Sequence, residues 1–180
     1  MSGNAFSNQI ANKNFLSPTG FKFILAKKPK VDFFCDSANI PDLNLGVAMQ
    51  PSYLKPIPIP GDTLSYGDLS LRFNIDEDME NYLEVYNWLI QFGYPDNLGQ
   101  YQQLLNEDGN SEGIQNAISG MSDGSLMIYN SNYIPNVKVN FRNLFPVSLS
   151  SVQFESKVND VIYLTANVVF KYTIFNIVKL

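Results

Sequence analysis

The last part of the chain, residues 161–175, constrains the fold more than any other stretch. From Ile162 to Tyr172 the even positions are apolar, while the odd positions are polar or amphipathic apart from Val169. Side chains alternate between two faces along a β-strand, so this pattern predicts one long strand with a buried face and a wetter face. At about 3.3 Å per residue the strand would run roughly 40 Å, long enough to organise other strands or to pair with another chain. The core positions expected on it are Leu164, Val168 and Phe170.

Composition and element order together predict the fold class. The chain has 180 residues, of which 45% are hydrophobic and 13% aromatic, which is enough to form one domain with a real core. Ten Tyr and thirteen Phe favour strands. Strand patterns come first, then one helix, then a loop, then further strands. This order favours antiparallel pairing, because parallel sheets need repeated helical crossovers. We therefore expect a mainly β protein, an antiparallel two-sheet β-sandwich or barrel with one flanking α-helix.

The composition also excludes several classes of site. The chain has no His and a single Cys, Cys35, so an internal disulfide, a thiolate or imidazole metal cluster and catalysis by a histidine base are excluded. Cys35 is expected to be an inert packed thiol, and no cofactor is predicted. No membrane segment and no secretory signal are expected, because the chain has no long apolar run and its N-terminus has no basic region. The net charge of −5 argues against tight binding of nucleic acid phosphates.

The first third of the chain contains a segment with an unusual composition. After residues 1–14, which are expected to be flexible, residues 21–26 and 31–36 are predicted to form a hairpin. Residues 38–60 then combine five prolines with many apolar side chains. Prolines interrupt helices and strand ladders, so this segment is predicted to be an extended, irregular arm. It either folds over its own core or docks on a neighbouring subunit, and the exposed apolar surface favours docking.

The middle of the chain contains the predicted helix. Asp76 is expected to cap it, acidic residues follow in its first turn, and Gly93 ends it. Trp88 lies on this helix, where packing is favoured over stacking on a sugar. Residues 94–124 are interpreted as a glycine-rich solvated loop with a short helix near 114–118. The inward-facing helix positions are expected to be Met79, Tyr82, Leu83, Tyr86, Leu89 and Ile90. Further strands are expected near residues 126–129, 137–141 and 149–154.

Three groups of motifs, in this order, resemble one family. The first is Phe15-Leu16-Ser17-Pro18 before Phe21-Lys22-Phe23, and the second is Ile59-Pro60-Gly61-Asp62 before the strand at 69–75. The third is Asn143-Leu144-Phe145-Pro146, followed by Leu149, Val152 and Phe154 and by the final alternating stretch. In these segments the chain resembles the tail tube proteins of contractile-tailed bacteriophages. Related tubes occur in type VI secretion and in phage-derived injection machines.

The resemblance implies a structural role rather than catalysis. It implies the phage tail tube fold, homo-hexameric rings whose strands join into one barrel around a channel, and stacking of the rings through an extended arm. The implied partners are the tail sheath and baseplate proteins, and genomic DNA would pass through the channel without specific binding. The implied location is the virion tail, assembled in the host cytoplasm.

A tube with an arm and a channel needs two sets of residues, and composition suggests candidates for each. The arm residues expected to contact other subunits are Leu43, Leu45, Met49, Tyr53 and Ile57. The candidates for lining the channel are Asp62, Asp68 and Glu155, because an acidic wall would repel phosphates and let DNA slide.

Three alternatives remain open from the sequence. A baseplate tube initiator or a tail-terminal ring protein would have the same fold. A carbohydrate-binding β-module would use exposed aromatic residues. An enzyme without histidine would need two carboxylates at roughly 5–10 Å, as in glycosidases, and the acidic residues here cluster at the helix start and in turns.

Overall fold

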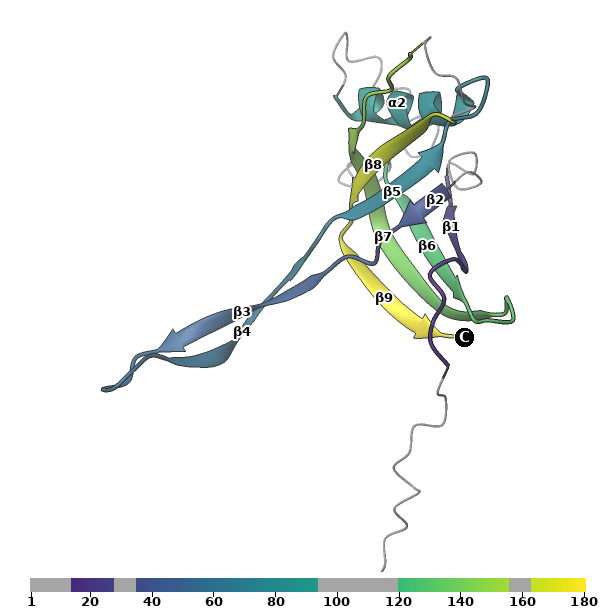
Figure 1. The fold of residues 1–180 in the computed structure, drawn as a ribbon. Helices are drawn as coiled ribbons and strands as arrows, with labels where there is room; N and C mark the ends of the chain where they lie inside the picture. Colours follow the sequence, from purple (N-terminus) through teal and green to yellow (C-terminus); the bar gives the residue numbers. More distant parts are fainter. Residues whose placement is uncertain (1–13, 28–34, 94–119, 156–162) are drawn as a thin grey trace, which may run out of the picture.

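The computed structural model describes residues 14–27, 35–93, 120–155 and 163–180. In these residues the protein is mainly β, every paired strand is antiparallel, and a single helix is present (Figure 1). The predicted fold class is therefore confirmed. The elements are β1 (Phe21–Leu25), β2 (Cys35–Ala38), β3 (Leu43–Gln50), β4 (Ile57–Tyr66), β5 (Leu69–Asn74), α2 (Glu80–Gly93), β6 (Ser122–Tyr129), β7 (Pro135–Leu149), β8 (Thr165–Lys171) and β9 (Ile174–Lys179).

Two sheets share the 15-residue strand β7. Sheet 1 has the order β1-β6-β7-β9 and uses the first part of β7, whereas sheet 2 continues from the last part of β7 through β8 and β5 to β2. The organising strand is therefore β7, and the prediction that the C-terminal stretch has this role is wrong.

The predicted long C-terminal strand is broken at Tyr172 and Thr173 into β8 and β9. The break is needed because β8 belongs to sheet 2 and β9 to sheet 1. Asn143 turns β7 at the same corner with a φ of 54°, and its side-chain amide donates to the Thr173 hydroxyl at 3.2 Å. The Thr173 N–H donates to the Arg142 carbonyl at 3.0 Å. At this corner β7 passes from sheet 1 to sheet 2, and the C-terminal stretch passes from sheet 2 to sheet 1. A pattern of alternating side chains cannot reveal such a change of sheet.

The core lies between the two sheets, and the alternation predicted for β8 is confirmed. Ala166, Val168 and Phe170 are fully buried there. Leu164 is an exception, because it precedes β8 and is only half-buried. The other large core side chains are Phe23, Leu25, Leu69, Leu71, Phe73, Val85, Trp88, Val139, Phe141 and Leu144.

Three local strand predictions are wrong. β1 pairs with β6, and β2 pairs with β5, so the predicted hairpin between them does not form. The strand predicted at 137–141 is confirmed as part of β7, which continues to Leu149, whereas residues 150–155 are not in a strand, so the strand predicted at 149–154 is wrong. β7 tolerates Pro146 because a bulge interrupts its ladder with β8 there. β6 begins at Ser122, so the end of the predicted glycine-rich loop is strand.

Several predictions lie outside the described residues. These are the flexible N-terminus up to residue 13, most of the first hairpin turn, loop residues 94–119 and the short helix near 114–118.

The helix α2 begins at Glu80, four residues after the predicted cap. Residues 76–79 form a turn in which the Met79 N–H donates to the Asp76 carbonyl at 3.0 Å, and Met79 has a φ of 55°. The Asp76 carboxylate still accepts an N–H of the first helical turn, from Asn81 at 3.3 Å. Asp76 therefore caps the helix across a turn that the sequence pattern did not show.

The helix lies across one end of the two sheets (Figure 1). Its most buried side chains are Asn81, Val85 and Trp88, whereas Leu83 and Tyr86, predicted to face inward, are about half exposed. The buried stripe is therefore rotated from the predicted one.

Trp88 has a packing role. Its side chain is 2% exposed, its ring lies 6.0 Å from that of Phe170, and its indole N–H donates to the Gly120 carbonyl at 2.8 Å. A sugar cannot stack on a ring that is buried in this way. The prediction of packing is confirmed, and the carbohydrate-binding alternative loses the residue on which it depended.

Candidate assembly surfaces

The predicted arm is a two-stranded ribbon, β3 and β4, that projects from the body (Figure 1). The ribbon spans residues 43–66, so the prediction of an irregular arm at 38–60 is wrong in its bounds and in its structure. Pro58 and Pro60 lie inside β4. They are tolerated because β4 pairs only with β3 and has one open edge, where a missing N–H breaks no ladder bond.

One face of the ribbon is continuously apolar. Residues that pair across two antiparallel strands share a face, and the pairs Leu45 with Leu64, Val47 with Pro60 and Met49 with Pro58 are all apolar. The opposite face mixes polar and apolar residues, with Asn44 opposite Ser65 and Gln50 opposite Ile57. We call the apolar set the arm face, and it consists of Leu43, Leu45, Val47, Met49, Pro58, Pro60 and Leu64.

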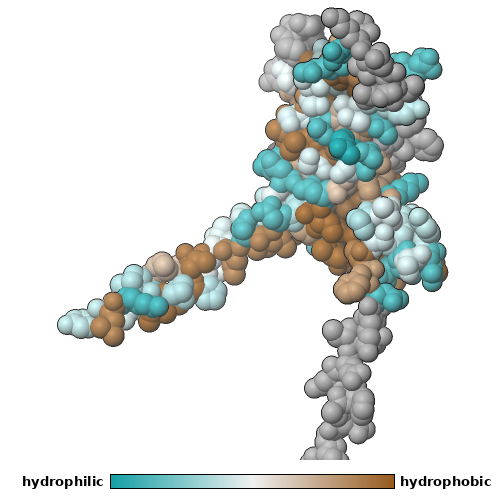
Figure 2. Space-filling model, in the orientation of Figure 1, coloured by the Kyte–Doolittle hydropathy of each residue, from teal (hydrophilic) through white to brown (hydrophobic). Residues whose placement is uncertain are grey.

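The arm face is uncovered. Its Leu, Val and Met side chains are between 45% and 66% exposed, and hydrophobic colour runs along the arm and over β9 in Figure 2. The ribbon projects away from the body, so the alternative in which it folds over its own core is not observed. An exposed apolar face of this extent is typical of a binding surface.

The five predicted arm residues lie on different parts of the ribbon. Leu43, Leu45 and Met49 lie on the arm face, Tyr53 is fully exposed at the tip, and Ile57 lies on the opposite face. Sequence reasoning missed Val47 and Leu64. The signal for Val47 was the alternation of L-N-L-G-V-A-M-Q, which was overlooked because the prolines indicated irregular structure.

The base of the arm is closely packed. The Gly67 N–H donates to the Asp42 carbonyl at 3.0 Å, and the Tyr172 hydroxyl donates to the Gly67 carbonyl at 2.9 Å. A Cβ at Gly67 would overlap the Asp42 carboxylate, so a side chain there would require Asp42 to move. These contacts fix the point at which the arm leaves the body.

Aromatic rings support the same point. Tyr172 lies 6.2 Å from Tyr66, 5.9 Å from Phe175 and 5.2 Å from Phe141, measured between ring centroids. Burial, together with the nearby carboxylates of Asp68 and Asp42, raises the pKa of Tyr172 to about 12. The neutral phenol is therefore the form that anchors the arm. Because Tyr172 follows β8 directly, the break in the C-terminal stretch also builds the base of the arm.

One edge of sheet 1 is open along β1. The Gly20 carbonyl accepts from the Tyr129 N–H at 2.8 Å, and the Ala26 N–H donates to the Asp123 carbonyl at 2.9 Å, so even-numbered residues of β1 face β6. In an antiparallel strand the alternate residues turn their backbone groups the other way. Among the described residues no backbone partner is present for those alternate residues, which are Phe21, Phe23 and Leu25.

The other edge of sheet 1 is open along β9. The Leu180 N–H donates to the Asn136 carbonyl at 2.9 Å, so even-numbered residues of β9 face β7. The backbone groups of Phe175, Ile177 and Lys179 then face outward, and the described residues supply no partner for them. Within the described part of the chain, sheet 1 thus ends on both sides in an unpaired edge.

The outer face of sheet 1, opposite the core, is basic. Lys22, Met127, Lys138 and Val178 form one row across β1, β6, β7 and β9, and Arg142 lies opposite Ile174 in another. Asp123 is the only acidic residue in these strands. No ion pair of Lys22, Lys138 or Arg142 is present in the described part of the chain. This face therefore carries a net positive charge in a chain whose net charge is −5.

The three acidic channel candidates lie away from sheet 1. Asp62 is on the arm, Asp68 is at its base in an ion pair with Lys171, and Glu155 follows β7. All three are exposed, and they come from different parts of the chain. Their role in a channel stays a prediction.

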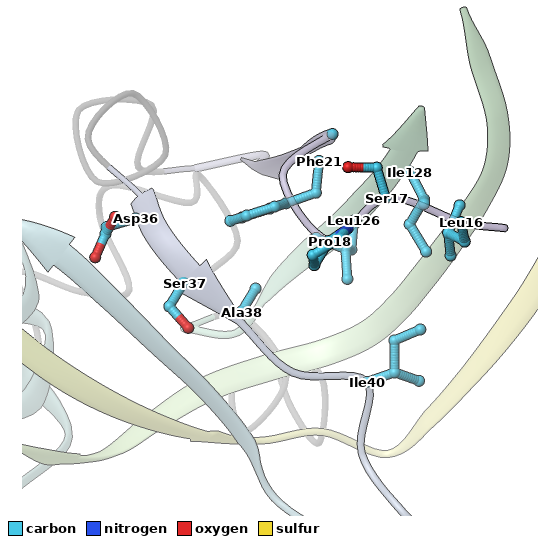
Figure 3. Close-up of a pocket in the computed structure, with 11 residues that line it drawn as sticks. Leu16, Ser17, Pro18, Phe21, Asp36, Ser37, Ala38, Ile40, Leu126 and Ile128 are labelled. Carbon is cyan, nitrogen blue, oxygen red and sulfur yellow. The ribbon is translucent and has the colours of Figure 1, made fainter. Parts of the chain in front are cut away.

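A hollow lies where β1 and β2 diverge (Figure 3). Leu126 and Ile128 of β6 line it, and Asp36 lies apart from this apolar group in Figure 3. The Asp36 carboxylate accepts from the Arg72 side chain at 2.9 Å. The lining residues of the hollow are Leu16, Ser17, Pro18, Gly20, Phe21, Asp36, Ser37, Ala38, Ile40, Leu126 and Ile128. The hollow is a mainly apolar opening, and its one carboxylate, Asp36, is paired with Arg72.

Other candidate chemistry is limited within the described residues. Cys35 is half-buried at the start of β2 rather than fully packed, and its thiol donates to the Ser37 carbonyl at 3.6 Å. Within the same residues, no cluster of three or more Cys, Asp or Glu side chains could hold a metal ion. The described helix is too short and too polar to cross a membrane.

Open sheet edges and a projecting apolar arm are typical of a subunit of a larger protein assembly. The sequence model of the family described as "Phage tail tube protein" matches residues 3–178. The chain belongs to this family and has a structural role of the tail tube type. The resemblance stated from the sequence motifs is confirmed.

Solved structures support the fold. A chain from the structure of the anti-feeding prophage cap, described as the tube terminating cap, gives a TM-score of 0.66 at 16% identity, over 99% of this chain and 100% of that one. A chain from the sheath-tube complex of the extracellular contractile injection system PVC gives 0.63 at 14% identity, over 99% and 100%. The sheath/tube terminator structure of PVC gives 0.62 at 14% identity, over 93% and 99%. A search of curated protein sequences gives no match.

Proposed function

We propose that this protein is the subunit of the inner tube of a contractile tail. In this proposal six copies form a ring, rings stack into a tube, and the channel conducts DNA during ejection. The observation that carries the proposal is the pair of unpaired edges on sheet 1, at β1 and β9.

The two edges are complementary in direction. Sheet 1 has four antiparallel strands, so β1 and β9 run in opposite directions. Rotation about a ring axis keeps every strand direction, so β9 of one copy meets β1 of the next in antiparallel orientation. Each edge offers three residues with outward backbone groups. Repeating this contact around a closed ring pairs every edge, which removes the exposed edges that otherwise promote aggregation.

Ring closure also identifies the channel wall. The inner face of sheet 1 packs on the core, with sheet 2 beyond it, and this bulk needs the larger space outside the ring. The outer face of sheet 1 would then line the channel. In this arrangement the three predicted channel residues are not part of the wall that sheet 1 forms. Asp62 lies on the arm, Asp68 at its base and Glu155 in the segment after β7.

The arm is suited to a contact beyond the ring that contains it. It extends away from the body and presents the arm face without a partner. Stacking on a neighbouring ring would bury this face and supply hydrophobic free energy. The sheath and baseplate proteins are the other proposed partners, by analogy with the sheath-tube complex described for PVC.

A proline substitution tests ring formation. The Ile177 N–H faces the open edge of β9, so Ile177→Pro should leave the ladder with β7 intact while removing one inter-subunit donor and restricting the edge. The matched control Ile177→Ala shortens the same side chain and keeps the N–H. We expect rings for the parent and for Ile177→Ala in negative-stain images, and folded monomers for Ile177→Pro. Rings of normal yield from Ile177→Pro would contradict pairing through this edge, and monomers of the parent under all conditions would contradict the proposal as a whole.

A ring that terminates or initiates a tube is the second candidate. It is favoured by the similarity to the chains from the tube terminating cap and the tube terminator. Stacking distinguishes the two, because a tube subunit forms long tubes when concentrated, whereas a terminal protein stops at a single ring.

A further inference from the structure

We propose that the outer face of sheet 1 binds the phosphates of nucleic acid, so that DNA in the channel is held electrostatically rather than repelled. The inference rests on the proposed function for the position of this face in a channel. It differs from the acidic, repelling wall that the net charge suggested.

The first argument is the segregation of charge. Acidic residues outnumber basic ones, 17 to 12, yet the four strands of sheet 1 contain only one acidic residue, Asp123. The described acidic residues otherwise lie on β2, on the arm and at its base, around the start of α2 and after β7. Lys22, Lys138 and Arg142 all point to the outer face, and none of them has an ion-pair partner in the described ranges. The net charge of the chain therefore does not represent this surface.

The second argument is the chemistry of the neighbouring side chains. Ser125, Asn140 and Asn176 form a row across β6, β7 and β9 beside the cations. Lys, Arg, Ser and Asn are side chains that commonly contact phosphate oxygens. Asp123 is the one carboxylate on this face, and it already accepts the Asn143 N–H at 3.1 Å. The face is therefore rich in hydrogen-bond donors and suited to a ligand that only accepts.

The third argument is the repetition of the contact. Lys22 and Lys138 are separated by one strand, which places their backbones roughly 10 Å apart. A rotationally symmetric ring repeats these lysines around the channel. Nucleic acid repeats its phosphates along each strand, so several lysines of the ring can contact phosphates at once. Tyr129 is the only aromatic side chain on this face of the four strands, so the surface has little capacity to stack bases. The contact would be independent of base sequence and weakened by salt.

The test compares two lysines on the outer face of sheet 1 with two lysines elsewhere on the subunit, Lys179 on the other face of β9 and Lys171 at the end of β8 in sheet 2. Lys138 lies on the outer face opposite Val178, while Lys179, the next residue of β9, has its side chain on the other face. The variant Lys22→Gln/Lys138→Gln and the control Lys171→Gln/Lys179→Gln remove the same charge. Assembled protein is mixed with a fluorescein-labelled linear 30-base-pair duplex at 50 and 200 mM NaCl, and binding is measured by anisotropy. Negative-stain images of each sample record the assembly state.

We expect the parent to bind the duplex at 50 mM NaCl and to bind at least tenfold more weakly at 200 mM. The Lys22→Gln/Lys138→Gln variant should lose at least tenfold in affinity at 50 mM, and the control should change less than twofold. Closed circular DNA cannot thread a preformed ring, so weaker binding of a relaxed circle would locate the contact in the channel. Equal binding of circular and linear DNA would contradict the channel position.

The outcomes separate the two proposals. Rings that do not bind the duplex, or an equal loss in both variants, would overturn this inference and leave the tube function standing. Parent protein that remains monomeric would overturn the tube function. The outer face of sheet 1 is exposed in the monomer, so the same assay would still measure whether this face binds phosphates. Tighter binding of poly-glutamate than of the duplex would assign the face to an acidic polypeptide and overturn the choice of nucleic acid.

Discussion

Replacing Leu43, Leu45 and Met49 by Ser should block stacking of rings without unfolding the protein. All three side chains lie on the arm face and contribute nothing to the core between the sheets. They are 50%, 52% and 63% exposed, so about half of each side chain is still accessible to a partner.

The magnitude follows from this exposure. Fully burying a Leu or Met side chain contributes about 1.5–3 kcal/mol, so covering the exposed half contributes about 1 kcal/mol for each residue. Three residues then contribute about 3 kcal/mol for each arm, which corresponds to more than about 100-fold in the association constant at 1.4 kcal/mol per tenfold. The fold should tolerate the change, because the same side chains are largely accessible in the monomer.

The opposite face of β3 supplies the control. Asn44, Ala48 and Gln50 alternate with the three arm-face residues on the same strand, and replacing them by Ser leaves the arm face intact. Tube formation is measured by sedimentation velocity and negative-stain imaging, and folding by thermal unfolding. Equal tube formation by the arm-face variant and the parent, or an equal loss in the control, would refute the assignment of the arm face to stacking.

Three further predictions concern the body of the subunit. Phe170→Asp should abolish cooperative thermal unfolding, because an unpaired charge at a fully buried position costs several kcal/mol against a total of about 5–15; an unchanged transition would place Phe170 outside the core. Trp88→Phe should lower the free energy of unfolding in urea by about 1–3 kcal/mol, because the Gly120 carbonyl loses its indole donor, and a change within error would show that this bond is dispensable. The pKa of Tyr172 is raised to about 12 from its ordinary value of about 10, so the neutral phenol stabilises the fold fully below about pH 10 and this contribution is lost as the pH rises towards 12. Tyr172→Phe should lack that alkaline loss in unfolding experiments between pH 9 and 12, and identical pH profiles for variant and parent would contradict the anchoring role.

Part of the assembly surface could be predicted from the sequence. Leu43, Leu45 and Met49 were identified because apolar residues in a proline-rich segment need cover, and they do lie together on the arm face. Leu64 was missed, because its place opposite Leu45 depends on a pairing register that includes a bulge beside Gly46. Gly61 allows this irregular register, since a Cβ there would lie 2.6 Å from the Gly46 carbonyl oxygen. A local pattern cannot supply a register of this kind.

Local sequence patterns were sufficient to predict the class of fold, the burial of Val168 and Phe170 and the packing role of Trp88. These depend on side-chain alternation and on local composition, which are properties of neighbouring residues.

The pairing of strands, the break of the C-terminal stretch at Tyr172 and the open edges of sheet 1 depend on contacts between residues that are distant in the chain. The charge of the outer face also depends on such contacts, because Lys22 and Lys138 are far apart in the chain and become near neighbours only when β1 and β7 flank β6. The net charge of −5 is a sum over the whole chain, whereas a polymer that contacts this sheet encounters only the side chains that the pairing of strands places on one face.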